Sequence, residues 1–253
     1  MPAEDYFFKP AQLYMELSIV IPAFDEENKI CSDIQLVSEF FHDANIEGEL
    51  IIIDDGSSDN TYKVASEFSG TAQLNCTILQ NDSNEGKGRA VKKGILASIG
   101  RFVLYADAGR TVPFSDALKG MELIKSGSCQ IAFGSRKLPE SKITRQQDLD
   151  RKIISKFMSF TLRQIFDIPE DLKDTQCGFK LYDGETGREI FSKLTIPGFL
   201  FEIETIMLAK KRGVVIKEFP VEWRCDRDSR LSFTGSSIPI IRDILRLRKL
   251  YKQ

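Results

Sequence analysis

The sequence predicts an α/β protein: a single domain in which helices flank a mostly parallel β-sheet. Strand-like and helix-like patterns alternate through the first half of the chain, which is typical of a parallel sheet covered on both faces. The 253 residues are 42% hydrophobic and 28% charged, a composition that suits a soluble globular protein with a full core. No internal repeat or clear linker divides the chain.

Short apolar runs and the helical spacing of apolar residues define the elements of the first half. Strands are predicted at Leu17–Ile21, Leu50–Ile53, Thr77–Leu79, Phe102–Ala106 and Gln130–Phe133. Helices are predicted between them, at Ile30–Phe41, Val64–Phe68, Lys87–Ser98 and Ala117–Ile124. Pro22 is expected to end the first strand.

The second half has a less regular pattern. Ser135–Asp150 is polar and charged, which predicts a mobile loop. Helices are predicted at Lys152–Phe166 and Glu202–Lys211, and strands at Gly178–Tyr182 and Val214–Phe219.

Composition excludes several classes of function. The net charge of −2 does not suit a protein that coats nucleic acid, so we expect no nucleic acid partner. The single histidine, His42, is predicted on the surface of a helix, which argues against a Ser-His-Asp triad. The five cysteines are scattered, odd in number and form no CxxC pair, so we expect a reduced compartment and no zinc site.

The N-terminal segment and the hydropathy of the chain bear on its location. Residues 1–14 lack the apolar core of a signal peptide. No apolar run approaches the roughly 20 residues of a membrane-spanning helix. We therefore expect a cytoplasmic protein.

The second predicted strand runs directly into the paired carboxylates Asp54 and Asp55, followed by Gly56. In α/β proteins, ligands bind where strands end at their carboxyl edge. Acidic side chains there can hydrogen-bond a nucleobase, hold ribose hydroxyls or help to bind a metal. The alternative is a plain strand-to-helix turn, in which Ser57–Asp59 cap the helix that follows.

Three further segments follow strand ends and carry the same two interpretations. Pro22–Asn28 could surround a nucleoside, or could place acidic residues at a helix N-terminus. In Asn84–Ala90, glycines could let backbone amides approach phosphate while Lys87 adds charge, or could only relieve strain. Asp107 ends the fourth strand and could either bind a ligand or sit in a turn.

Taken together, these segments resemble the family 2 glycosyltransferases of the GT-A fold, a Rossmann-like α/β architecture. Asp174–Leu181, with the sequence DTQCGFKL, resembles the branch of dolichyl-phosphate glucosyltransferases and polyprenyl-phosphate-mannose synthases. Ile131–Arg136 and Trp223 followed by Ser229–Ser232 fit the same branch. The resemblance divides the domain 15–253 into a nucleotide-sugar-binding half, 15–134, and an acceptor-binding half, 135–253.

The resemblance implies an inverting hexosyltransferase that uses a nucleotide sugar, with UDP-glucose favoured over GDP-mannose, and a polyprenyl or dolichyl phosphate acceptor. The implied nucleotide-binding residues are Pro22, Ala23, Phe24, Glu26, Asp54, Asp55, Gly56, Lys87, Gly88, Asp107, Ala108 and Arg110. Asp107 and Asp174 are the implied catalytic residues.

The sequence departs from the family at its metal-binding motif. The usual Asp-x-Asp is here Asp107-Ala108-Gly109, so the second carboxylate is missing. Asp107 is then the expected ligand of Mg²⁺ or Mn²⁺, which would bind weakly. Arg110 could neutralise a diphosphate instead, so we expect weak metal dependence.

A lipid phosphate acceptor would be held by basic and polar side chains of the second half. The implied residues are Arg136, Arg151, Ser155 and Arg230. Arg151 and Ser155 could equally form an ordinary solvated helix face. Asp174 is expected to orient or deprotonate the acceptor, and Glu202 or Glu204 would be the alternatives if the acceptor were a hydroxyl.

The C-terminal segment 238–252 is predicted to be an amphipathic helix. One stripe is apolar and another basic, with Ile240, Ile244, Leu247 and Tyr251 in the first and Arg242, Arg246 and Lys249 in the second. Such a helix can make peripheral contact with an anionic membrane, or can pack on the domain with its arginines in water.

Two other functions remain open from the sequence. One is a soluble family 2 transferase that acts on a glycan or protein hydroxyl. The other is a nucleotide-sugar-binding protein that has lost its activity, which the broken Asp-x-Asp suggests. A dinucleotide-binding oxidoreductase is disfavoured, because Pro22–Asn28 has no glycine fingerprint.

Overall fold

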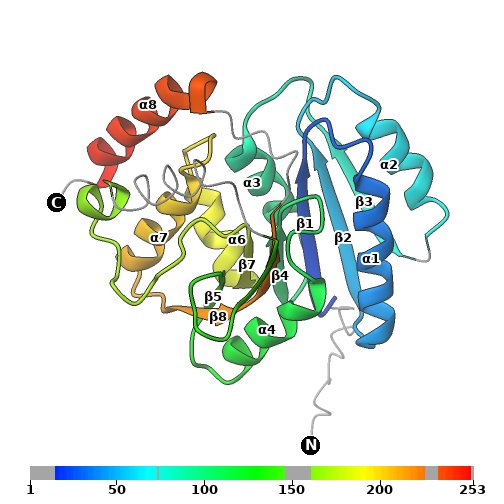
Figure 1. Ribbon diagram of the computed structural model, residues 1–253, viewed down its shortest axis with the longest axis horizontal. Coiled ribbons are helices and arrows are strands. Elements are labelled where there is room, and N and C mark those ends of the chain that lie inside the picture. Colours follow the sequence, from blue (N-terminus) through cyan, green and yellow to red (C-terminus); the bar gives the residue numbers. More distant parts are fainter. Residues whose placement is uncertain (1–14, 73, 146–160, 226–232, 252–253) are drawn as a thin grey trace, which may run out of the picture.

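The computed structural model describes residues 15–72, 74–145, 161–225 and 233–251, and of these the side chains of 233–239 are not considered. Its centre is a seven-stranded sheet with the order β3-β2-β1-β4-β7-β5-β8 (Figure 1). All neighbouring strands are parallel except β7, which runs antiparallel to both β4 and β5. The prediction of a mostly parallel sheet flanked by helices is confirmed.

The first half of the chain forms the alternating elements that the hydrophobic pattern predicts. The strands are β1 (Leu17–Ala23), β2 (Gly48–Asp54), β3 (Asn75–Gln80), β4 (Phe102–Ala106) and β5 (Ile131–Ser135). The helices are α1 (Ile30–Asp43), α2 (Thr61–Ser69), α3 (Lys87–Ala97), the short 3₁₀ helix η1 (Phe114–Asp116) and α4 (Ala117–Lys125). Every residue of β4 and β5 is buried, as expected for strands covered on both faces.

The second half adds two strands to the sheet and the helices beside them. These elements are β7 (Phe179–Asp183), α6 (Gly184–Lys193), α7 (Phe201–Lys211), β8 (Ile216–Pro220) and α8 (Phe233–Tyr251). A separate two-stranded sheet pairs β6 (Lys142–Arg145) with β9 (Glu222–Arg224). Residues 161–165 are helical and Phe166 lies in the turn that follows, whereas 152–160 of the predicted helix lie outside the described residues.

Two details of the prediction are wrong. Strand β1 does not stop at Pro22 but continues to Ala23, because the β1–β4 ladder has already ended at Val20 and no bond from Pro22 toward β4 is needed. Lys142–Arg145 is not loop: it forms β6. Its partner β9 lies about 80 residues later in the sequence, as the pairing of Ile143 with Trp223 shows, so local pattern could not reveal the pairing.

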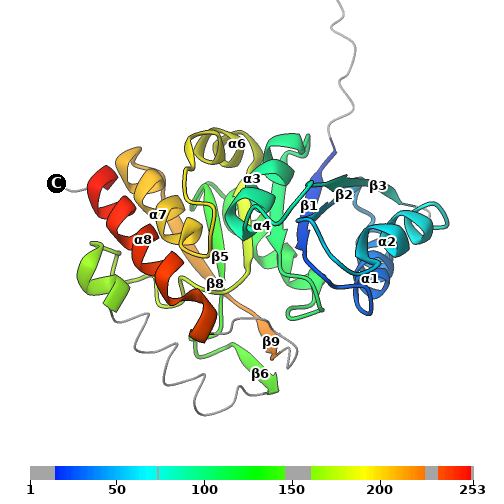
Figure 2. The same ribbon diagram turned by 90° about the horizontal axis from the view of Figure 1, so that it is seen from above.

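Buried side chains form one core on each side of the sheet. On one side, Ile30, Ile34 and Val37 of α1 pack with Met121 of α4 against the strands. On the other side the core collects helices α3, α6, α7 and α8, and α8 lies alongside α7 (Figures 1 and 2). In the part of the chain that the structure describes, no helix is long and apolar enough to cross a membrane.

The direction of the strands decides where a ligand can bind. Strands β1, β2, β4 and β5 all end at the same edge of the sheet. Because β7 is antiparallel, it begins at this edge, and the DTQCGFKL segment therefore reaches the edge as well. All the segments singled out in the sequence thus meet at one edge, where ligands of α/β proteins bind.

Candidate active site

Asp54 and Asp55 are buried at the end of β2 and are hydrogen-bonded to neighbouring loops. Asp54 accepts hydrogen bonds from the amide and hydroxyl of Ser57, and from Nε2 of Gln80 at 2.9 Å. Asp55 accepts from Nδ2 of Asn81 at 2.8 Å and from the amides of Glu85 and Gly86, both at 2.9 Å. Both carboxylates therefore hold the loops of this edge together, and their contact with a nucleoside stays a prediction.

The loops after β1 and β2 are tied to each other. The amide of Asp25 donates to Oγ of Ser57 at 2.7 Å, and the amide of Ser58 donates to Oδ1 of Asp25 at the same distance. The amide of Glu26 donates to Oγ1 of Thr61 at 2.7 Å. The structure thus brings Pro22, Ala23, Phe24 and Glu26 beside the Asp54–Gly56 turn, as the resemblance implies.

The segment Glu85–Arg89 presents an ammonium group to the site rather than a row of backbone amides. The amides of Glu85 and Gly86 bind Asp55, and the amide of Gly88 donates to the carbonyl of Pro197 at 2.7 Å. The carbonyl of Pro197 also accepts from the amide of Arg89 at 3.3 Å. These amides are already paired within the protein, so charge from Lys87 is what the segment offers a diphosphate.

Lys87 and Asp107 form an ion pair at the centre of the edge. Nζ of Lys87 lies 2.7 Å from Oδ1 of Asp107, which also accepts a hydrogen bond from the hydroxyl of Tyr105 at 2.6 Å. Burial works to lower the pKa of Lys87, but the Asp107 carboxylate outweighs it and the pKa lies above its ordinary value. Sequence reasoning missed Tyr105, which is buried within β4 and reads as a core residue.

Gly178 of the DTQCGFKL segment packs directly on Asp107. A Cβ atom at Gly178 would lie 2.0 Å from Oδ2 of Asp107, so a larger side chain there would have to displace this carboxylate. The amide of Asp107 also donates to the carbonyl of Gly178 at 2.9 Å. The two motifs that the sequence marked separately are therefore one structural unit.

Asp33 of α1 positions the turn that replaces the second half of Asp-x-Asp. Its carboxylate accepts from the amides of Gly109 at 2.9 Å and Arg110 at 3.1 Å. Both residues have positive φ, +89° and +56°, so the turn is held in a left-handed conformation. Asp33 is fully buried, and burial raises its pKa to about 6 although the two amides lower it.

Sequence reasoning also missed Asp33, although a signal exists. It lies between Ile30 and Ile34 on the helix face that carries the apolar residues facing the core. An acid on such a face needs a hydrogen-bonding partner, which could have been sought in the loops of the carboxyl edge.

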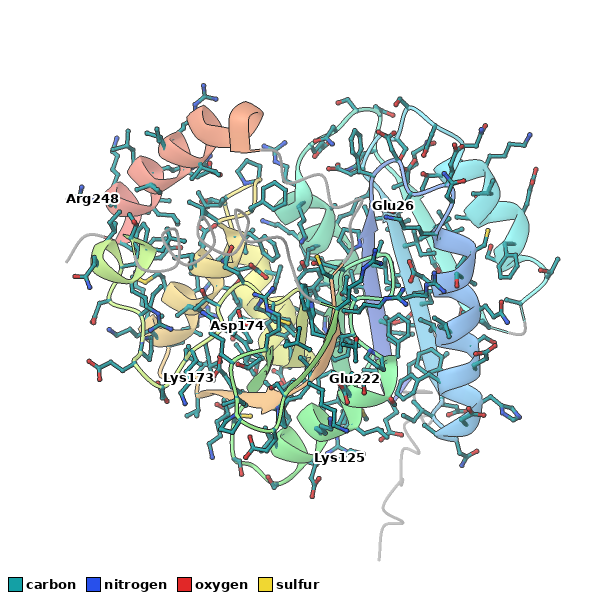
Figure 3. The ribbon with its side chains drawn as sticks, viewed as in Figure 1. Glu26, Lys125, Lys173, Asp174, Glu222 and Arg248 are labelled. Carbon is teal, nitrogen blue, oxygen red and sulfur yellow. The ribbon has the colours of Figure 1, made fainter. Side chains whose placement is uncertain are left out.

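Arg110 lines a cavity of about 550 Å³ that is separate from the Lys87–Asp107 pair. The cavity lies between the second half of α1 and residues 111–118, with Glu222 and Arg224 of β9 on its border (Figure 3 labels Glu222). Of the predicted site residues that the structure describes, Arg110 alone lines it. Its contact with a diphosphate stays a prediction.

Arg136 and Asp174 form a second ion pair, on the β5–β7 side of the edge (Asp174 in Figure 3). Nε and Nη2 of Arg136 each lie 2.7 Å from a different oxygen of Asp174, whose side chain is 1% exposed. Burial alone would raise the pKa of Asp174, but Arg136 lowers it to about 2. The guanidinium also stacks on Trp223, 5.2 Å from the ring centroid.

This pairing bears on the predicted roles of both residues. A carboxylate with a pKa of about 2 is a weak base near neutral pH, so the geometry favours orientation by Asp174 over proton removal. Arg136 donates two hydrogen bonds to Asp174, from Nε and Nη2. The remaining N–H donors of its guanidinium could bind a phosphate.

Glu202 and Glu204 both form an ion pair or hydrogen bonds with other groups of the protein. Glu202 pairs with the fully buried Lys180, whose Nζ also donates to the carbonyl of Cys177. The pKa of Glu202 lies above its ordinary value, because burial raises it more than the Lys180 ammonium lowers it. Glu204 accepts from Thr195 and from the amide of Ile196 at 2.7 Å, at the start of the loop that reaches α3. Sequence reasoning did not assign Lys180, although it lies in the motif.

The remaining predicted acceptor residues cannot be placed. Arg151, Ser155 and Arg230 lie outside the described residues, and their roles stay predictions.

The carboxylates at this edge offer few metal ligands. Among the described residues, no three His, Cys, Asp or Glu side chains come together as a metal-binding group. Asp107 can supply one carboxylate, and its Oδ1 already contacts Tyr105 and Lys87. Such a site fits a divalent cation whose other ligands are diphosphate oxygens and water.

A continuous line of contacts joins the predicted residues of the two halves. Asp55 holds the amide of Gly86, the next residue Lys87 reaches Asp107, and Asp107 packs on Gly178. Gly178 lies four residues after Asp174 in the same segment. The acids of both halves therefore lie along one edge of the sheet rather than on unrelated surfaces.

A family model described as glycosyl transferase family 2 matches residues 18–191 of this chain. The chain belongs to this family. This family 2 glycosyltransferase is 35% identical over 245 residues to a dolichyl-phosphate beta-glucosyltransferase of Dictyostelium discoideum, covering 93% of this chain and 74% of that protein. It is 30% identical to the protein of the same name from Saccharomyces cerevisiae, covering 93% and 75%.

Solved structures show that the glycosyltransferase has the GT-A fold. Mannosyl-3-phosphoglycerate synthase from Rubrobacter xylanophilus superposes with a TM-score of 0.69 at 16% identity, covering 94% of this chain and 76% of that one. Glucosyl-3-phosphoglycerate synthase from Mycobacterium tuberculosis, in complex with Mn²⁺ and UDP-glucose, superposes with a TM-score of 0.66 at 20% identity, covering 92% and 79%.

Proposed function

We propose that this enzyme transfers glucose from UDP-glucose to a dolichyl or related polyprenyl phosphate, with inversion at the anomeric carbon. The observation that carries the proposal is the contact between Asp107 and Gly178, which joins the donor-side carboxylate to the DTQCGFKL segment. The names of the relatives from Dictyostelium and yeast support the same sugar and acceptor. The UDP-glucose complex of the mycobacterial neighbour supports the donor.

The charges along the edge suit a single displacement of a diphosphate. The leaving group needs positive charge that is in place before the reaction, and Lys87 supplies an ammonium that its partner Asp107 keeps protonated. Lys87 is half-buried, and the ring centroids of Tyr105 and Phe199 each lie 5.6 Å from its Nζ, which reduces the screening of its charge by water.

The state of the acidic side chains favours a phosphate acceptor over a hydroxyl. A hydroxyl requires a base, whereas a phosphate is already ionised at neutral pH. Asp174 has a pKa of about 2 and is paired with Arg136, and Glu202 is paired with Lys180. Neither carboxylate is poised as a base, which supports transfer to a lipid phosphate over the glycan or protein hydroxyl.

A divalent cation fits this proposal as a companion of the donor. We infer that Asp107 would hold Mn²⁺ or Mg²⁺ together with diphosphate oxygens, as the single carboxylate there allows. Such a cation supplies further charge neutralisation to the leaving diphosphate. The Mn²⁺ and UDP-glucose complex of the mycobacterial neighbour supports this assignment.

The partner and location follow from the proposed acceptor. A dolichyl or polyprenyl chain lies in a membrane, so we infer peripheral contact with a membrane surface. Cys31, Cys76, Cys129 and Cys177 are free thiols, which supports the reducing cytoplasmic side.

A matrix of donors and acceptors tests the proposal. The full chain is incubated with UDP-glucose or GDP-mannose, and with dolichyl phosphate, dolichol or no acceptor, in detergent. We expect glycolipid and UDP only with UDP-glucose and dolichyl phosphate together. Product with dolichol would point to a hydroxyl acceptor, and tight UDP-glucose binding without turnover would identify a binding protein.

The same assay tests the cation. With EDTA we expect turnover to fall by less than about tenfold and to return with Mn²⁺ or Mg²⁺, because a cation held by the single carboxylate of Asp107 binds weakly. Full activity in EDTA would assign the neutralisation to Lys87 and Arg110 alone.

A further inference from the structure

Helix α8 uses its first apolar stripe for packing on the domain. Leu247 is fully buried, and Ile240, Ile244 and Tyr251 pack against the core formed with α7. The hydroxyl of Tyr251 donates to Oε1 of Glu204 on α7 at 3.1 Å. The stripe that the sequence offered for a membrane therefore faces inward, which confirms the packed interpretation for these residues.

A second, outward face of α8 combines apolar and basic side chains. Ile241 and Leu245 are 57% and 61% exposed, and they lie one helical turn apart on the same face. Arg242, Arg248 and Lys249 are exposed around them. We call these five residues the outer face of α8.

The charge of α8 differs in sign from that of the whole protein. Its described side chains include Arg242, Arg246, Arg248 and Lys249, all exposed, whereas the chain as a whole has a net charge of −2. The one acid among them, Asp243, is 8% exposed and faces the Pro197–Gly198 loop, since a Cβ at Gly198 would lie 2.8 Å from its Oδ2. The outer face is therefore a local patch of positive charge.

We propose that the outer face of α8 docks on an anionic lipid bilayer. The exposed arginines and lysine are complementary to anionic headgroups, and the two exposed aliphatic side chains can enter the boundary between headgroups and acyl chains. Nucleic acid or an acidic protein would satisfy the charges but not the aliphatic pair. This inference rests on the proposed function, because docking on a bilayer would bring the enzyme to its lipid phosphate acceptor.

The position of α8 connects this surface to the catalytic edge. Asp243 lies against the Pro197–Gly198 loop, and the carbonyl of Pro197 binds the amide of Gly88 at the start of α3. The neighbouring residue, Lys87, contacts Asp107. Through these contacts a bilayer bound by α8 would lie next to the loop that contacts the start of α3 (Figures 1 and 2 show α8 alongside α7).

Vesicle sedimentation tests this surface without the reaction. The full chain is mixed with vesicles of phosphatidylcholine, with or without phosphatidylserine, at low and high salt, with no polyprenyl phosphate and no donor. We expect binding to the anionic vesicles that weakens as salt rises. Equal binding to neutral vesicles, or no binding to anionic ones, overturns the proposal.

Matched variants locate the contact. Ile241→Ser with Leu245→Ser should weaken vesicle binding on the order of tenfold, because the two exposed aliphatic side chains proposed to enter the bilayer are lost. Leu96→Ser with Ile99→Ser removes two aliphatics of similar exposure, 43% and 53%, from α3 and the turn after it, and should leave binding unchanged.

A second pair of variants tests the charges. Arg248→Gln with Lys249→Gln should lower binding about tenfold and flatten its salt dependence. Lys63→Gln with Lys193→Gln, two exposed lysines on α2 and α6, should do neither. Equal losses in both charge variants would mean a general electrostatic attraction and overturn the assignment to α8.

Transfer in detergent separates this proposal from the proposed function. Ile241→Ser with Leu245→Ser should keep glucose transfer to a short polyprenyl phosphate in detergent while losing vesicle binding. If the wild type binds anionic vesicles through α8 but transfers no sugar, the surface stands and the proposed function falls. The bilayer would be overturned as the partner if the wild type also bound an acidic protein or RNA and Ile241→Ser with Leu245→Ser weakened that binding as much as it weakened vesicle binding.

Discussion

The carboxylate of Asp33 in α1 accepts a hydrogen bond from the amide of Arg110, 77 residues later in the chain, at 3.1 Å. This bond and its neighbour from Gly109 hold the left-handed turn that follows Asp107. The turn that lacks the second carboxylate of Asp-x-Asp is thus held by a carboxylate from another element, Asp33 of α1.

Replacing Asp33 should loosen this turn. We expect Asp33→Ala to lower the free energy of unfolding by about 2 kcal/mol, because the amides of Gly109 and Arg110 lose a charged acceptor. The KM for the sugar donor should rise as well. Urea unfolding and donor kinetics measure the two effects. Asp43→Ala, an exposed change on the same helix, is the control, and an unchanged KM in Asp33→Ala would separate the turn from donor binding.

Gly178→Ala should displace Asp107, because the added Cβ would overlap its carboxylate. Misplacing a group at the reaction centre by about 1 Å can cost on the order of 100-fold in rate, so we expect a fall of that size in turnover. Steady-state kinetics and a thermal melt of the variant give the measurement. Gly70→Ala, whose Cβ would meet nothing closer than 3.7 Å, should behave as wild type.

Lys87→Gln should remove the cation that faces the leaving diphosphate. We expect kcat/KM for the donor to fall about 100-fold or more, since one preorganised donor at developing charge has an effect of this order. Lys87→Arg should recover part of the loss. Arg89→Gln removes an exposed cation that contacts Glu85, and a comparable fall there would show that general charge, not the Lys87–Asp107 geometry, is responsible.

The Arg136–Asp174 pair should make the free energy of unfolding depend on pH in the acidic range. The pKa of Asp174 falls from 3.8 to about 2 in the folded protein, so its contribution of about 2 kcal/mol is present above about pH 4 and is lost as the pH falls toward 2. Unfolding of wild type and Asp174→Asn between pH 2 and 5 should show a steeper slope for the wild type. Asp167→Asn, at a 90% exposed carboxylate, should keep that slope.

The activity of Asp174→Asn tests the role of Asp174 in the reaction. We expect Asp174→Asn to cut turnover while the affinity for the nucleotide stays nearly intact, because Asp174 pairs with Arg136, a proposed ligand of the acceptor phosphate. Unchanged turnover would remove Asp174 from the mechanism.

The architecture could be predicted from the sequence because it rests on local patterns. Buried strands such as Phe102–Ala106 are continuous apolar runs, and α1 repeats its apolar residues at helical spacing. The strand Lys142–Arg145 could not be predicted, since its stability depends on a distant partner around Trp223. Long-range pairing of this kind leaves no local signal.

The residues of the candidate site likewise include some that the sequence could predict and others that it could not. Acids at strand ends, such as Asp54 and Asp107, stand out because their position in the pattern is unusual. Their partners do not: the Arg136–Asp174 pair and the Asp33–Gly109 bond join residues that are neighbours only after folding. Backbone donors, such as the amide of Gly88 bound to Pro197, also become visible only in three dimensions.

The reversed direction of β7 has a consequence for how the acceptor half can vary. Its register is set on both sides, by Phe179 opposite Ala106 in β4 and Lys180 opposite Phe133 in β5. Insertions or deletions between β5 and β7 would therefore change the connecting chain without shifting Gly178 against Asp107. If residues 135–253 bind the acceptor as proposed, this part of the chain could adapt to another acceptor while the proposed donor-binding groups keep their positions.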